Sequence, residues 1–235
     1  MIQFTSEEYT GPLHFVEFWL ETIDTWEKLH KQKQFIALSA TKEVQDAVLN
    51  NTLLAPVVDV VDIKYWYYQN DGSAYAPEGG KNLAPRQWGR LLKPKSLSFD
   101  QVYRAVKEYR LKCPDKAVLF SVDGAEKFGW AVLMGGGSLP VLPQSTDISF
   151  LRAASKMSPS DKYGKYCLAG KNGIIIYSDT KDKIDLDLSA FSGLLSVQFI
   201  NPQTGKVSDK VEKIASGKNI SIALKDMENI VWISQ

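Results

Sequence analysis

Residues 57–63, with the sequence VVDVVDI, constrain the fold of this chain more than any other stretch. β-branched residues make up most of the run, which is typical of a β-strand that is buried on both faces. Such a strand needs other elements to cover each of its faces. The patterns before and after it therefore decide the fold class.

Strand-like and helical patterns alternate along the first 157 residues. Apolar residues at helical spacing fill the stretch from His14 to Leu29 and residues 98–113, Thr41 is placed to cap a further helix, and residues 128–134 form a short one. The strand-like runs are residues 2–4, 35–40, 57–65, 117–122 and, between glycines and prolines, about 138–142. The alternation predicts an α/β fold with a parallel sheet, which we interpret as a partial (β/α)8 barrel of about five strands.

The pattern changes after Met157. Residues 158–165, SPSDKYGK, are typical of a linker, and about seven short strand-like runs with turn signals follow them. This part predicts a small antiparallel β-sandwich. We therefore expect a barrel-like domain at residues 1–157 and a β-sandwich domain at residues 162–235.

Charge and composition exclude several classes of partner. The chain has 28 basic and 27 acidic residues, so no long-range field would attract nucleic acid or an anionic membrane. No apolar run approaches the ~20 residues of a membrane span, and the first ten residues lack the pattern of a signal peptide. Cys113 and Cys167 lack metal-ligand spacing, so we expect neither a metal nor a cofactor, and their pairing stays open.

A long aromatic segment follows the buried strand. Tyr65 and Trp66 begin it, with Lys64 just before them and Arg86 further on, and it is too long to be a plain connector. Aromatic and basic side chains at the carboxyl end of a buried strand favour a ligand-binding surface. The alternative is that the aromatic residues only pack the segment against the domain.

Carboxylates follow at least two of the expected strands. Glu7 and Glu8 follow the first, Asp62 belongs to the third, and Asp123 and Glu126 follow the fourth. Glycoside hydrolysis needs a pair of carboxyl groups, one as acid and one as nucleophile or base. Taken alone, however, a glutamate after a strand is more often a solvated charge or part of a helix start.

Other chemistries fit the sequence less well. His14 and His30 are the only histidines, and both lie in or beside the first helix, so no Ser-His-acid constellation is expected. The GGGS sequence at residues 135–138 lacks the lysine and the strand-then-helix order of a phosphate-binding loop.

Several motifs in order resemble one family. They are EEYTGP, FVEFWLETIDTWE, the segment at residues 57–87, FGWAVLMGGGSLPVLP and, in the last part, QFINPQTGKV. Together they resemble the second half of bacterial barrel-type glycoside hydrolases of the apiosidase-like group, with the C-terminal module labelled collagen-binding. The family is typically periplasmic or secreted, whereas the chain itself leaves its location open.

The resemblance implies roles for particular residues. Glu8, after the fourth barrel strand, would be the acid/base, with the neighbouring Glu7 as a fallback, and the nucleophile would follow the seventh strand. There the sequence departs from the family, because Asp123 comes first and Glu126 three residues later. Tyr65, Trp66 and Arg86 would line the sugar site, and Trp130 would lie beneath it.

A closed barrel needs eight strands, whereas this chain supplies about five. We therefore expect either that this chain is a piece of a longer protein, or that a second copy or a separately encoded N-terminal half covers the open sheet. The expected function is that of a glycosidase once the barrel is complete. The alternatives are a non-catalytic carbohydrate-binding protein and a structural fragment of such an enzyme.

Overall fold

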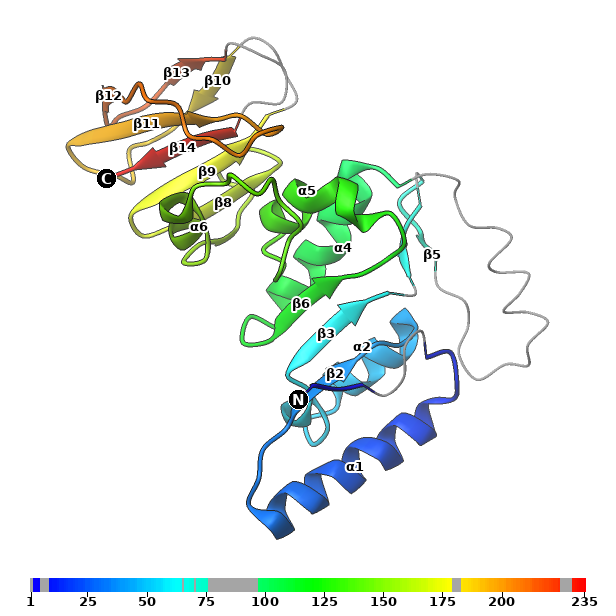
Figure 1. Cartoon of the computed structure of the whole chain (residues 1–235). Helices are drawn as coiled ribbons and strands as arrows, with labels where there is room; N and C mark the ends of the chain where they lie inside the picture. Colours follow the sequence, from blue (N-terminus) through cyan, green and yellow to red (C-terminus); the bar gives the residue numbers. More distant parts are fainter. Residues whose placement is uncertain are drawn as a thin grey trace. The chain divides into compact units, whose positions relative to one another are not determined.

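The computed structural model describes residues 2–4, 9–64, 66–69, 71–75, 97–178, 183–224 and 230–235. The chain forms two compact units (Figure 1). Unit 1 comprises Met1–Phe128 and Gly137–Leu139, and unit 2 comprises Gly129–Gly136 and Pro140–Gln235. The expected domains, 1–157 and 162–235, place the boundary later in the chain and stay a prediction.

Unit 1 is built around a parallel four-stranded sheet in the order β1-β2-β3-β6. The strands are β1 (Ile2–Phe4), β2 (Phe35–Leu38), β3 (Val60–Ile63) and β6 (Ala117–Phe120). All three strand pairs are parallel, so all four carboxyl ends lie at one edge of the sheet. The end of the buried run forms the central strand β3, which is shorter than the expected strand at residues 57–65 because Val57 belongs to the 3-10 helix η1 (Ala55–Val57). The expected parallel α/β sheet is confirmed.

Within the described residues, three α-helices connect these strands (Figure 1): α1 (Leu13–His30), α2 (Lys42–Asn50) and α4 (Phe99–Lys112). Their apolar stripes face the core, where Leu20, Val48 and Val106 are fully buried. Ser98 begins α4 with a capping box, because its hydroxyl accepts from the backbone N–H of Gln101 while the Gln101 side chain accepts from the backbone N–H of Ser98. Thr41 occupies the N-cap position of α2, but its side chain makes no capping hydrogen bond.

The expected fifth strand near residues 138–142 is wrong. The structure has no strand there, and the backbone N–H of Ser138 donates one hydrogen bond to the Val118 carbonyl at 2.7 Å. A single bond does not make a ladder, because Pro140 and Pro143 lack the N–H groups that a strand must donate.

Part of the expected aromatic loop is a small hairpin. Strands β4 (Tyr67–Tyr68) and β5 (Ala74–Tyr75) pair in antiparallel fashion. Asp71 and Gly72 form the turn, in which Gly72 adopts a φ of 86° and the backbone N–H of Ser73 donates to the Asp71 carboxylate at 2.8 Å. Glycine tolerates this positive φ without steric cost, which explains the turn.

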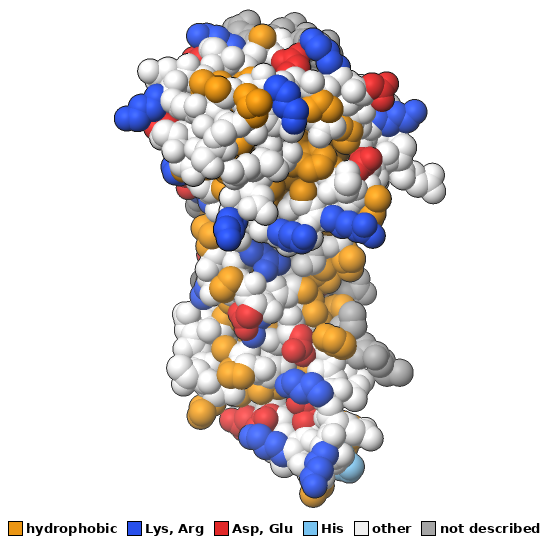
Figure 2. All heavy atoms as spheres, turned by 90° about the vertical axis from the view of Figure 1, so that its left-hand side faces the viewer, with side chains coloured by type: hydrophobic (Ala, Val, Ile, Leu, Met, Phe, Trp, Pro, Cys, Tyr) orange, Lys and Arg blue, Asp and Glu red, His pale blue; other side chains and the backbone are white. Residues whose placement is uncertain are grey.

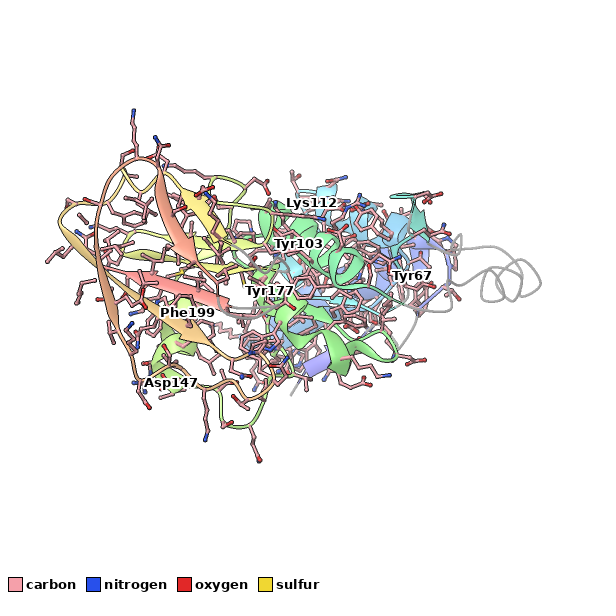
Figure 3. All side chains as sticks on the ribbon, turned by 90° about the horizontal axis from the view of Figure 1, so that it is seen from above. Tyr67, Tyr103, Lys112, Asp147, Tyr177 and Phe199 are labelled. Atoms are coloured by element: carbon pink, nitrogen blue, oxygen red, sulfur yellow. The ribbon has the colours of Figure 1, made fainter. Side chains whose placement is uncertain are left out.

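Unit 2 contains an antiparallel six-stranded sheet and a two-stranded sheet, β10-β13. The larger sheet has the order β12-β11-β14-β9-β8-β7. Tyr177 lies on β9 and Phe199 on β11 (Figure 3). The strands are β7 (Ser158–Pro159), β8 (Cys167–Gly170), β9 (Gly173–Tyr177), β10 (Lys183–Leu186), β11 (Leu194–Ile200), β12 (Glu212–Ala215), β13 (Ile220–Ala223) and β14 (Ile230–Ser234).

Both sheets of unit 2 contribute to one hydrophobic core. Leu186 and Ile222 come from the small sheet, whereas Ile174, Val197 and Ile233 come from the large one. Burial of these branched side chains away from water is the main stabilising contribution to this unit. The antiparallel β-structure expected after the first domain is therefore confirmed.

Two short helices also belong to unit 2: α5 (Gly129–Met134) and α6 (Ile148–Ala154). Asp147 caps α6, because its carboxylate accepts from the backbone N–H groups of Ser149 and Phe150 (Figure 3). The ring of the fully buried Phe150 lies between Trp130 and Trp232, with centroid distances of 6.1 and 5.8 Å. These rings attach both helices to the large sheet.

Three details of unit 2 differ from the expectation. The expected linker contains β7, which pairs with β8, and residues 201–207 form a turn instead of a strand. Strand β12 was not expected, because its sequence EKIA is half charged and its side chains stay largely exposed. Edge strands carry such sequences because one side of their ladder faces water.

Surface properties agree with the balanced composition. Basic and acidic side chains are mixed on the face shown in Figure 2. Within the described residues, no helix is long and apolar enough to cross a membrane. Cys113 and Cys167 are both buried free thiols, which answers the question of their pairing.

Candidate functional site

The candidate site is the carboxyl edge of the parallel sheet in unit 1. Asp62 on β3 and Ser121 just after β6 meet there, with the serine Oγ donating to the Asp62 carboxylate at 2.5 Å. Ser39, which follows β2, shares their side of the sheet, because Ala37 pairs with Val60 and side chains two residues apart share a face. Three polar side chains thus form a row across β2, β3 and β6.

Two side chains of this row are buried, whereas Ser121 is exposed. Asp62 is only 5% exposed, and Ser39 is fully buried. Within the described part of the chain, the Ser39 hydroxyl has no hydrogen-bond partner. A buried hydroxyl without a partner costs free energy, so its position next to a carboxylate calls for a functional or structural reason.

A second pair of charged groups extends the row outward. Lys64 lies just beyond the end of β3, and Asp123 lies in the turn that follows β6. The Lys64 ammonium lies 3.5 Å from the Asp123 carboxylate, and the Asp123 side chain is 87% exposed. The edge therefore carries one buried and one exposed carboxylate.

The expected catalytic residues are only partly described. Glu8, Tyr65 and Arg86 lie outside the described residues. Tyr9, the residue after Glu8, pairs with Ala40 just beyond the end of β2. Glu126 is exposed in the short 3-10 helix η2 (Ala125–Phe128), beyond Asp123.

Trp66 is not available as a sugar-binding surface, which corrects the expected role. It is fully buried, and its indole Nε1 donates to the Gln45 side-chain carbonyl at 2.7 Å. The Gln45 amide in turn donates to the backbone carbonyls of Leu38 and Asp62, at 2.9 and 2.7 Å. Trp66 therefore supports the ends of β2 and β3 from the helix side.

The neighbouring aromatic residues are also structural. Tyr67 is 3% exposed, and the Tyr68 hydroxyl donates to the Glu108 carboxylate. Burial, then Glu108, raises the pKa of Tyr68 above its ordinary value. The packing alternative for this segment is thus the better interpretation of the residues described here.

A network of charged side chains links α2 to α4. Figure 3 labels Tyr103 and Lys112, which both lie on α4. The Lys42 ammonium contacts Asp46 at 2.9 Å and Glu108 at 2.6 Å, and Lys112 contacts Asp46 at 2.9 Å. Burial raises the pKa of Asp46, but the hydrogen bonds from both lysines outweigh it and leave this pKa below its ordinary value. The network joins the helices away from the polar row.

Trp130 belongs to unit 2, where it packs as a structural residue. Its indole Nε1 donates to the Pro202 carbonyl at 2.7 Å. Among the described residues, no group of His, Cys, Asp or Glu side chains could hold a metal ion.

One residue of the row, Asp62, could have been given more weight from the sequence. Asp62 is an acidic residue inside the most apolar run of the chain, and a buried acid usually has a specific partner. Its partner Ser121 carries no sequence signal, because only the register between β3 and β6 brings the two side chains together.

Comparison with known proteins gives one family and two similar folds. Residues 1–157 match a family described as a domain of unknown function, DUF6298. A glycoside hydrolase family 5 structure from Bacteroides vulgatus ATCC 8482 is similar, with a TM-score of 0.49 and 10% identity over 86% of this chain and 55% of the other. A structure described as a glycoside hydrolase gives a TM-score of 0.43 and 10% identity over 86% and 57% of the two chains.

The chain thus spans less than two thirds of the length of either protein. Comparison with curated proteins finds no match.

Proposed function

This chain belongs to the DUF6298 family, and from its own residues we propose that it is a glycoside hydrolase-like protein. We infer that it acts on a polysaccharide or an oligosaccharide. The observation that supports this proposal best is the polar edge of the parallel sheet. Asp62, Ser121, Lys64 and Asp123 come from two neighbouring strands and gather where all the carboxyl ends meet. Enzymes with parallel α/β sheets bind their substrates at that edge.

The proposed chemistry uses two carboxyl groups. Glu8 gives its proton to the leaving oxygen, and a carboxylate after β6, either Asp123 or Glu126, attacks the anomeric carbon or activates a water molecule. The Lys64 ammonium lies 3.5 Å from the Asp123 carboxylate and forms an ion pair with it. A separation of about 5 to 5.5 Å between the two carboxyl groups would give retention, and about 6.5 to 9.5 Å inversion.

The proposal includes the architecture around the site. The sheet of unit 1 is taken as half of a (β/α)8 barrel and the two sheets of unit 2 as a β-sandwich. The sequential order β1-β2-β3-β6 supports the barrel, because neighbouring strands of a barrel follow one another along the chain. The shared core of the two sheets in unit 2 supports the sandwich.

The test is hydrolysis of a panel of aryl glycosides by the full chain, followed by Asp123→Asn and Glu126→Gln. The variant that removes the nucleophile or base should lower turnover by about 10²- to 10⁴-fold, whereas the other should stay near the original rate. Full turnover in both variants would exclude a carboxylate after β6 from the reaction.

A non-catalytic protein is the second candidate, because Asp123 is largely exposed and pairs with a lysine, as a solvated surface charge does. Its expected aromatic surface is reduced, however, since Trp66 and Tyr67 are buried. Calorimetry with oligosaccharides separates the candidates: binding without hydrolysis supports the non-catalytic protein, and hydrolysis supports the enzyme.

A further inference from the structure

Helix α1 carries a second apolar stripe that faces away from the domain. Phe15, Phe18, Trp26 and Leu29 are 45, 66, 40 and 76% exposed. At 100° per residue the centre of the stripe lies about 140° around the helix from the centre of the buried pair Val16 and Leu20. Four large apolar side chains along one exposed helix face are an interaction surface rather than scattered surface residues.

The polar residues within this stripe need no water. Thr22 and Thr25 donate their hydroxyls to the carbonyls of Phe18 and Glu21, at 2.7 and 2.8 Å. Their hydroxyl donors are therefore satisfied inside the helix, so a partner can cover the stripe without leaving them unpaired. The Trp26 ring is also held in place, because it stacks on His30 with a centroid distance of 4.6 Å.

The stripe is symmetric about Thr22. Phe18 and Trp26 lie four residues before and after it, and Phe15 and Leu29 lie seven residues before and after it. In an antiparallel pair of α1 helices with a two-fold axis at Thr22, each phenylalanine therefore faces Trp26 or Leu29 of the second copy. A sequence with this symmetry is self-complementary, as an isologous interface requires.

Helix dipoles favour the same antiparallel arrangement. An antiparallel pair of α1 helices places opposite ends of the two dipoles side by side, whereas a parallel pair places like ends side by side.

We propose that this stripe, formed by Phe15, Phe18, Trp26 and Leu29, is a homodimer interface in which two α1 helices pack antiparallel about Thr22. The contact uses one helix from each copy and is smaller than the about 800 Å² per partner of a standard interface. The dimer should therefore dissociate on dilution. This interface is independent of the proposed hydrolase activity.

Sedimentation of the full chain over a range of concentrations tests the proposal. Phe18→Glu should weaken dimerisation by about tenfold or more, whereas Leu53→Glu, at an 82% exposed position outside the stripe, should leave it unchanged. A chain that stays monomeric at every concentration overturns the proposal, even if it binds a vesicle or another protein. Equal weakening by both variants also overturns it.

Cysteine cross-linking tests the register. Thr22→Cys should form a disulfide between two copies, because residue 22 lies on the two-fold axis. Phe15→Cys should not, since the two copies of residue 15 would be about 21 Å apart along the helices. Cys113 and Cys167 are buried and should not interfere. Cross-linking through both new positions would indicate a parallel pair and overturn the antiparallel arrangement.

Discussion

Ser121 donates a hydrogen bond to Asp62 at 2.5 Å and so links the ends of β6 and β3. Asp62 is almost completely buried. The Ser121→Ala variant removes the donor and leaves one oxygen of a buried carboxylate without this partner. Because Ser121 itself is exposed, water can reach the site, and we expect a loss of about 0.5–1.5 kcal/mol in the free energy of unfolding, measured by chemical denaturation. Thr52→Ala, at an exposed position in the same unit, should change it by less than about 0.5 kcal/mol.

Trp66 should behave as a structural residue and not as a ligand contact. Trp66→Phe keeps a buried ring but removes the indole N–H that Gln45 accepts. The variant should lose about 1–3 kcal/mol of stability, while the affinity of the folded protein for any oligosaccharide it binds should stay unchanged. Loss of sugar affinity without loss of stability would restore the role that the sequence suggested.

The stability of unit 1 should fall in acid because of Asp46. Burial raises the pKa of this carboxyl, but the hydrogen bonds from Lys112 and Lys42 lower it by more than burial raises it. The pKa in the folded state therefore lies below the pKa in the unfolded state. The unfolded state then binds the proton first as the pH falls. This contribution is complete above the unfolded pKa of about 3.9 and is lost as the pH falls through the folded pKa.

Denaturation of the original chain and of Asp46→Asn across this pH range checks the sign. The difference in stability between the two proteins should shrink as the pH falls. Asp115→Asn is a suitable control in the same unit, because the Asp115 side chain is 76% exposed. A constant difference between Asp46→Asn and the original chain would show that Asp46 is not linked to folding in this way.

Unit 2 has a packing requirement at Gly129, where α5 begins. A Cβ atom added there would lie 1.7 Å from the Val141 carbonyl oxygen, which is backbone and cannot rotate away. Gly129→Ala should therefore destabilise unit 2 by about 3 kcal/mol or more. Gly217→Ala is the matched control, since its nearest contact would be 3.9 Å away, and thermal unfolding should separate the two variants.

The sequence predicted most elements of unit 1 because each carries its own periodic pattern. The run at residues 57–63 predicted β3, and the apolar spacing from His14 to Leu29 predicted α1, which spans Leu13–His30. The expected strand near Ser138 failed for a different reason. Pro140 and Pro143 lack the N–H groups that a strand must donate to its neighbour, and these prolines were already visible in the sequence.

The site was less predictable than the fold. Trp66 has the residue type of a sugar-binding platform, but only the packing of α2 and α4 shows that it is buried. The Asp62–Ser121 bond depends on strand register between residues 59 positions apart. Patterns in sequence identify which faces are apolar, whereas contacts between distant polar residues require the fold.

The central claim is that the chain hydrolyses glycosidic bonds with Glu8 as the acid. Its most direct test is the turnover of an aryl glycoside by Glu8→Gln, compared with Glu7→Gln as the neighbouring control. The account predicts that Glu8→Gln lowers turnover by about 10²- to 10⁴-fold while calorimetry still detects sugar binding, and that Glu7→Gln keeps the original rate. Unchanged turnover in Glu8→Gln would contradict the account.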